Sequence, residues 1–239
     1  MKDQSKLFLL TEEGFQWYPN SIQFLDKHFM VLIKKNDNVK NDELYPRIKN
    51  LSYSLQYIQF IKKVISDINL TSVLWTQNVK ALVIQGASVI ESIFDYLVKC
   101  NGLANKTEWS KVRALNTSEY QIENKKFKNE VIIHEKLDSE KDMQMSFDQM
   151  AKKVEKKKLL GENYQHYSSI NALRKLRNKI HIHDSEHYLD TDWNNFNDSQ
   201  YQLVCKILHS ILTSELFEDS DYTDKFDFLI SSFKKNIEM

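Results

Sequence analysis

The sequence predicts an all-α protein, a helical bundle built on a long antiparallel helix pair with three further helices. Its 239 residues include only four glycines and two prolines, too few for the closely spaced turns of an all-β sandwich or barrel. Apolar residues recur at intervals of three and four along several stretches, which is the spacing of one helix face. With 41% hydrophobic residues the chain can bury a sizeable core, so we expect a single domain spanning 1–239.

The first elements are predicted to be helices. Residues 1–39 are expected to pack onto the bundle, with a helix over about 20–34. A long helix should begin at Tyr45-Pro46, because apolar residues fall on one stripe from Ile48 onward and proline suits a first turn. The second long helix is predicted over about 72–100. Its Gly86 lies on the apolar face, so it favours a tight antiparallel pair with the first long helix.

The helical period fails between 103 and 140. The segment IENKKFKNEVIIHEKL is charged, β-branched and partly alternating, which fits either a small β-hairpin or a long loop inserted into a bundle core at about 40–216. Helical patterning returns over about 145–160, 163–182 and 198–217. Residues 218–239 are interpreted as an acidic C-terminal tail.

Several features of the sequence predict the cellular compartment of the protein. The N-terminus lacks the apolar run of a signal peptide, and the longest apolar stretch, 81–98, contains Gln85, Glu91 and Asp95. That stretch therefore indicates a buried helix and no membrane contact. The two cysteines fit no metal or redox spacing. We expect a protein of the reducing cytoplasm.

Charge is unevenly distributed although the formal net charge is zero, a balance that argues against a generic nucleic-acid coat protein. Basic residues crowd between 152 and 179, and acidic ones between 215 and 227. Two interpretations stand: a basic patch for a polyanion, or two ordinary solvated faces.

The most distinctive stretch is LRKLRNKIHIH, residues 173–183. On a helix, the apolar residues of this region form one buried stripe and four polar residues follow its edge. The edge residues, in angular order, are Arg177, His181, Arg174 and Asn178. His183 lies on the opposite edge if the helix continues, and can swing towards the arginine if the helix ends after Ile180.

Three interpretations of this cluster compete. The side chains can be ordinary surface groups. A metal site could use His181, His183 and His187, but residues two apart diverge on a helix and no further ligand completes the set. Phosphate chemistry would use a guanidinium that binds phosphate oxygens, an imidazole that titrates near neutral pH and an amide that orients them.

The Arg-Asn pair followed by histidine, near the end of a late helix, resembles the signature of the HEPN superfamily, Arg-x(4–6)-His with a polar residue often after the arginine. The segment GASVIESIFDYL is similar to the second-helix pattern of such domains. The resemblance covers about 40–216. It implies that Arg177 is the family arginine and Asn178 its polar neighbour, with either Arg177-x5-His183 or Arg174-x6-His181 as the motif.

The resemblance further implies a homodimer whose two motifs face each other in one cleft. Many members are metal-independent endoribonucleases of toxin, antiphage or RNA-processing systems, and others only bind nucleotides or partner proteins. The expected activity is RNA cleavage by the ribose 2′-OH, with no cofactor and no metal, and with an antitoxin or regulatory protein as a further partner. The competing hypothesis is a non-catalytic helical module that binds a partner protein or nucleotide.

Two further expectations concern the surroundings of the motif. Glu91 either meets the arginine from the second long helix or is a solvated edge residue. Lysines are expected to hold the phosphates that flank the cleavage site. These are Lys152, Lys153, Lys156, Lys157 and Lys179.

Overall fold

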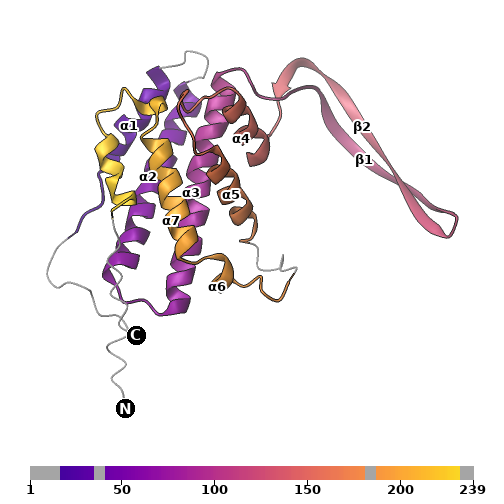
Figure 1. Cartoon of the computed structure of the whole chain (residues 1–239). Coiled ribbons are helices and arrows are strands. Elements are labelled where there is room, and N and C mark those ends of the chain that lie inside the picture. Colours follow the sequence, from indigo (N-terminus) through magenta and orange to yellow (C-terminus); the bar gives the residue numbers. More distant parts are fainter. Residues whose placement is uncertain (1–16, 35–40, 181–186, 232–239) are drawn as a thin grey trace. The chain divides into compact units, whose positions relative to one another are not determined.

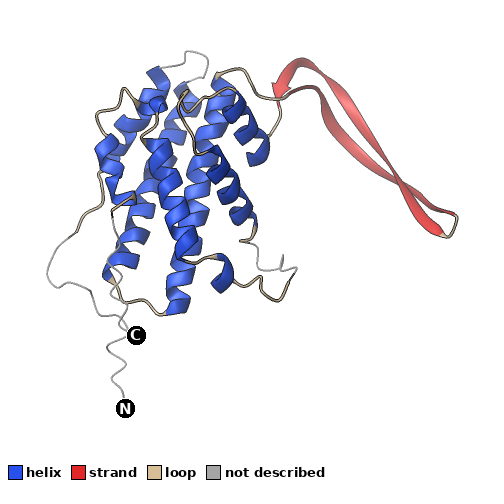
Figure 2. Ribbon diagram, viewed as in Figure 1, coloured by secondary structure: helices blue, strands red, loops and turns tan. Residues whose placement is uncertain are grey.

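A computed structural model of the chain describes residues 17–34, 41–180 and 187–231 (Figure 1). The chain divides into two compact units. Residues 102–146 form one, and the residues before and after them form the other. The larger unit is a helical bundle and the smaller one is a β-hairpin (Figure 2).

The all-α prediction was wrong. Strands β1 (Lys106–Ile122) and β2 (Lys125–Asp142) form an antiparallel two-stranded sheet of 17 and 18 residues, so the protein is largely helical but of mixed class. The segment that fitted either a small hairpin or a loop is a long hairpin. Its β-branched and aromatic residues favour extended backbone, and their spacing is close to two.

The first three helices are α1 (Ile22–Lys34), α2 (Asn41–Asp67) and α3 (Ser72–Cys100). α2 begins before the predicted start, so Pro46 lies inside it and not in its first turn. α2 packs against both α1 and α3. α3 is long and apolar enough to cross a membrane by length and composition, but 61% of its most apolar window is buried in the protein. That burial is typical of a core helix.

Gly86 allows a close helix approach, but to a different neighbour from the predicted one. A Cβ atom at Gly86 would lie 2.6 Å from Val204 Cγ2 and 3.1 Å from Leu208 Cδ1. Both residues belong to α7 (Asp198–Leu212), which packs against α3 (Figure 1). The apolar stripe of the sequence identified the buried face of α3, but it could not identify which helix covers that face.

The bundle is completed by shorter elements. Within the described part of the chain they are α4 (Phe147–Lys156), α5 (Tyr167–Asn178), α6 (Asp192–Asn195) and the 3-10 helices η2 (Glu215–Phe217) and η3 (Thr223–Leu229). A capping box of Asn197 and Gln200 fixes the start of α7. The segment predicted as an acidic tail packs on the bundle as far as residue 231, because it also carries Phe226 and Leu229, which are buried.

Two of the buried polar side chains connect helices of the bundle to its C-terminal segment. His28 of α1 is fully buried, with its ring 4.3 Å from that of Phe217 and 4.5 Å from that of Phe226, and its Nδ1 atom lies 2.8 Å from Ser220 Oγ. Lys62 of α2 donates to the carbonyl of Leu229 at 2.9 Å. His28 thus ties α1, and Lys62 ties α2, to the C-terminal segment.

Candidate functional site

Helix α5 presents the predicted arginines at the margin of the core. Ile170, Leu173 and Leu176 are buried, and α5 packs against α3, α4 and α7. Arg174 and Arg177 flank that stripe, with 22% and 38% of their side-chain surfaces exposed. The helix ends at Asn178, earlier than the predicted 182.

Arg177 contacts Glu91 of α3, its Nη2 atom lying 3.6 Å from Glu91 Oε2. Of the two expectations for Glu91, the structure therefore bears out the meeting with the arginine. The separation is that of an ion pair and is too long for a good hydrogen bond. Because both side chains are about one-third exposed, the pair holds the guanidinium in place while leaving it open to a ligand from solvent.

Arg174 is held by Asp148 in the first turn of α4, with Nη2 3.0 Å from Oδ1. Asp148 also binds Lys152 at 2.7 Å. The hydrogen bond from Lys152, and then the charge of Arg174, hold the pKa of Asp148 below its ordinary value. Among the described residues, the buried Arg174 Nε atom has no hydrogen-bond acceptor.

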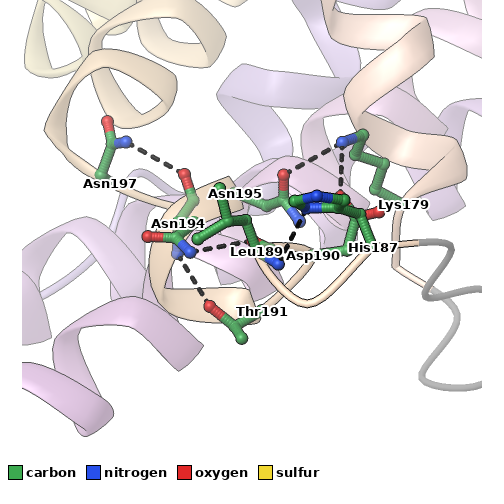
Figure 3. A network of polar contacts seen from close by, with 8 residues as sticks. All are labelled: Lys179, His187, Leu189, Asp190, Thr191, Asn194, Asn195 and Asn197. Atoms are coloured by element: carbon green, nitrogen blue, oxygen red, sulfur yellow. Dashed lines mark hydrogen bonds and ion pairs between the residues drawn. The ribbon is translucent and has the colours of Figure 1, made fainter.

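A polar network fixes the chain next to the end of α5 (Figure 3). Lys179 Nζ binds Asp190 Oδ1 at 3.0 Å and Asn195 Oδ1 at 3.3 Å. The hydrogen bond from Lys179 lowers the pKa of Asp190. Asn194 donates to the carbonyl of Leu189 at 2.8 Å. Lys179 therefore joins α5 to the segment that begins at residue 187.

The two predicted catalytic histidines, His181 and His183, lie outside the described residues. The network of Lys179, Asp190 and Asn195 holds the chain on both sides of them. The choice between the two histidines stays open.

Three exposed rings follow this position, of which the sequence analysis considered His187 only as a metal ligand and did not single out Tyr188 or Trp193. His187 is exposed and its Nδ1 atom accepts from the backbone N–H of Leu189 at 3.2 Å. Tyr188 is 82% exposed and Trp193 is 58% exposed. Exposed aromatic rings near cationic side chains can stack on unpaired bases. In the sequence these rings stand in EHYLDTDW, a stretch whose composition alone indicates no relation to the arginines.

A shallow pocket of about 240 Å³ lies between α5, α6 and α7. It combines two cations, three amides and a small apolar part. The lining residues are Lys175, Lys179, Asn194, Asn195, Gln200, Ala172, Leu176 and Leu203. Such a lining suits one phosphate or sugar unit, because cations and amides bind anionic and hydroxyl oxygens.

The predicted phosphate-binding lysines do not form one group. Lys152 shares Asp148 with Arg174, and Lys179 lies at the end of α5. Lys153 lies on α4, and Lys156 ends that helix about 12 Å along its axis from Asp148. Lys157 follows directly and is exposed. The structure therefore brings Lys152 and Lys179 to α5, and leaves Lys156 and Lys157 at the far end of α4.

A larger pocket of about 480 Å³ is lined by His166, His209 and Glu215, among others. Tyr164 and Ser210 form a hydrogen bond of 2.8 Å in its wall. None of the lysines and arginines that the structure describes lines it, and the Glu215 carboxylate accepts hydrogen bonds from Glu162 and Asn163. A pocket with a carboxylate and no cation is poorly suited to a phosphodiester, so the end of α5 is the better candidate site.

No family model matches the chain, and no curated protein or solved structure is similar to it by the comparisons made. The resemblance to HEPN domains therefore stays a prediction. Within 17–34, 41–180 and 187–231, no group of three or more His, Cys, Asp or Glu side chains could hold a metal ion. The candidate site is defined by its cations, amides and exposed rings.

Proposed function

We propose that the chain is a metal-independent endoribonuclease of the HEPN type, acting at the end of α5 as a homodimer in the cytoplasm. The observation that carries the proposal is the partly exposed Arg177, held at the core margin by Glu91 and followed by Lys179 and the rings of Tyr188 and Trp193. These groups fit single-stranded RNA, because a guanidinium binds phosphate and exposed aromatic rings stack on bases.

The mechanism uses the substrate's own nucleophile. A ribose 2′-OH attacks the adjacent phosphate, the bond to the 5′-oxygen breaks, and the products carry a 2′,3′-cyclic phosphate and a 5′-OH. His181 or His183 takes the proton of the 2′-OH, and a protonated imidazole donates one to the leaving oxygen. Arg177, with Arg174, stabilises the added negative charge on phosphorus, and Asn178 orients one of these groups.

The proposed dimer would supply both imidazoles, one from each copy of the motif. Because an unrestrained ribonuclease harms its own cell, a toxin or antiphage role with an antitoxin or regulatory protein accompanies this proposal. RNA is the substrate, and neither a cofactor nor a membrane takes part.

The test is cleavage of end-labelled single-stranded RNA in the presence of EDTA. We expect cleavage of RNA and none of the same strand with 2′-deoxyribose throughout. Arg177→Ala should lower the rate about 10²- to 10³-fold, the usual effect of removing a group that stabilises transition-state charge. Lys157→Ala, at the far end of α4, is the matched control and should change the rate little. Cleavage that requires a metal, or that attacks the deoxy strand, would contradict the proposal.

The histidines are separated by single substitutions. His181→Ala and His183→Ala should differ, with one variant losing cleavage and the other retaining most of it. His187→Ala tests the exposed imidazole that the motif does not include. If all three variants cleave at the normal rate, histidine catalysis at this site is wrong.

One observation favours a second candidate function, a non-catalytic module that binds nucleic acid, nucleotide or a partner protein. Arg174 and Arg177 are both paired with carboxylates, Asp148 and Glu91, which offset their charge. In this case the wild-type chain would bind labelled RNA or a nucleotide in a salt-dependent way without cleaving RNA. Binding measured by fluorescence anisotropy, beside the cleavage assay, separates the two functions.

A further inference from the structure

The hairpin has two unlike faces. β2 runs from Lys125 to Lys136 without a bulge, so its side chains alternate strictly between the faces. The register carries this alternation across to β1. One face is mainly apolar, and the other carries charged pairs such as Glu119 with Lys128.

Six residues form what we call the apolar hairpin face. They are Leu115, Tyr120, Ile122, Phe127, Val131 and Ile133. Contacts within the hairpin support the assignment, since the rings of Tyr120 and Phe127 stack at 5.7 Å and Tyr120 donates to Asn129 Oδ1 at 3.1 Å. Five of the six side chains are 41–52% exposed. An isolated two-stranded hairpin is only marginally stable in water, so this face calls for a cover.

Charged residues on the apolar hairpin face follow a simple order. By the register, the face carries Lys125 near the turn, Arg113 beside Ile133, and Glu135 towards the base. Lys125 and Glu135 are equally far from residue 130, about 33 Å apart along the strand. A copy of the face turned end for end about residue 130 would therefore place Lys125 over Glu135.

The hairpin is neutral as a whole. Residues 106–142 contain eight basic and eight acidic side chains. This balance disfavours a nucleic acid as the cover. On the apolar hairpin face itself, Lys125 lies towards the turn and Glu135 towards the base, so an inverted copy of the face brings opposite charges together.

We propose that the cover is the hairpin of a second copy of this chain, packed face to face with the turns at opposite ends. The twofold axis lies between the sheets and across the strands near residue 130, so β2 lies over β2 and β1 over β1. Phe127 then packs on the partner's Ile133. Arg113 lies over the ring of the partner's Tyr120, and Lys125 meets the partner's Glu135. Two such sheets would pack about 10 Å apart, as in a β-sandwich.

This contact is separate from the proposed ribonuclease site, because it uses none of the α5 residues. A dimer through the hairpin is compatible with one through α5, because the two contacts share no residue. The tests therefore measure how substitutions in the hairpin change association and crosslinking of the full chain.

The first test is a charge exchange, measured by sedimentation of the full chain at low salt. Lys125→Glu and Glu135→Lys should each weaken association about tenfold or more, because each places like charges together. The double variant K125E/E135K should restore it. Restoration requires contact between chains, since the two residues are too far apart within one hairpin to pair.

Apolar variants give a matched comparison. Ile133→Glu, on the apolar hairpin face, should reduce association, whereas Ile132→Glu, its neighbour on the opposite face, should not. Ile132 and Ile133 are 43% and 44% exposed, so they differ in face and hardly in burial. Equal effects of the two variants would overturn the proposal.

The second test is crosslinking of the double variant K125C/E135C with a short bis-maleimide, because sheets packed about 10 Å apart hold the cysteines too far from each other for a direct disulfide. We expect a covalent dimer, and none from K126C/K136C, which has the same spacing on the other face. Absence of the dimer would overturn the proposal, and so would crosslinking of K125C with itself, which indicates turns at the same end. RNA cleavage by the same variants is measured in parallel. Cleavage without the hairpin contact rejects only this inference, and the contact without cleavage rejects only the proposed ribonuclease.

Discussion

The bundle and the hairpin differ in how deeply they bury their phenylalanine side chains. In the bundle Phe94, Phe196 and Phe226 have no exposed surface, whereas Phe127 of the hairpin is 41% exposed. Helices with a three- and four-residue spacing cover one another, since each stripe meets several neighbours. A two-stranded sheet has no second layer of its own. The bundle therefore encloses a core of its own, whereas none of the described side chains of β1 and β2 is buried.

The largest expected effect comes from emptying a phenylalanine site in each region. Phe226→Ala should lower the free energy of unfolding by about 3–5 kcal/mol, because it leaves a cavity in the core. Phe127→Ala should change the unfolding of the bundle by less than about 1 kcal/mol, since it loses one ring stack at the surface. Guanidinium unfolding followed by circular dichroism at 222 nm measures both. Similar losses for the two variants would mean that the regions do not differ as described.

An intermediate effect is expected from pH. Burial lowers the pKa of His28 to about 3, against about 6.5 in the unfolded chain. The unfolded state therefore binds a proton that the folded state excludes. Stability from this group is complete above pH 6.5 and falls by about 1.4 kcal/mol for each pH unit below it.

Unfolding between pH 6.5 and 4.5 measures this slope before most carboxylates titrate. His28→Gln should flatten the slope although it destabilises the protein overall. His134→Gln, in the exposed hairpin, is the matched control and should leave the slope unchanged. A slope that survives the substitution of His28 would assign it to other groups.

The smallest expected effect concerns the turn of the hairpin. Glu123 and Asn124 have φ angles of 45° and 62°, the left-handed region that a two-residue type I′ turn requires. Glutamate is a poor residue there, so replacing the pair by Asn-Gly should stabilise the hairpin by about 1 kcal/mol. Slower amide hydrogen exchange in β1 and β2, with the bundle unchanged, would show it. Unchanged exchange in the strands would mean that the turn does not limit hairpin stability.

The sequence was informative where one helix face decides the structure. Apolar residues at intervals of three and four predict which face of a helix is buried. This local spacing predicted the buried face of the 72–100 helix. It also placed the arginines beside Leu173 and Leu176. The partners of those helices do not follow from it. Gly86 meets α7, and Arg177 meets Glu91, because residues distant in the sequence converge. The exposed rings of Tyr188 and Trp193 could be related to the candidate site only from the positions of α5 and α6 in the structure.

The prediction of an all-α fold was wrong for a physical reason. Few glycines do not preclude a single long hairpin, since one turn suffices for two strands and Asn124 can adopt a positive φ. Bulges in β1 also broke the strict alternation that would have predicted a strand. The regular half of β2, where alternation is intact, lies in the segment that was described only as partly alternating.

The base of the hairpin closes on itself. Lys106 pairs with Asp142, and the N–H of Met143 donates to the carbonyl of Asn105 at 2.6 Å. The two ends of the hairpin segment, residues 106 and 142, are thus about 5 Å apart, as across any antiparallel pair. A short glycine–serine bridge could therefore replace residues 106–142 without stretching the chain, and the same junction could carry a fluorescent protein or an epitope tag.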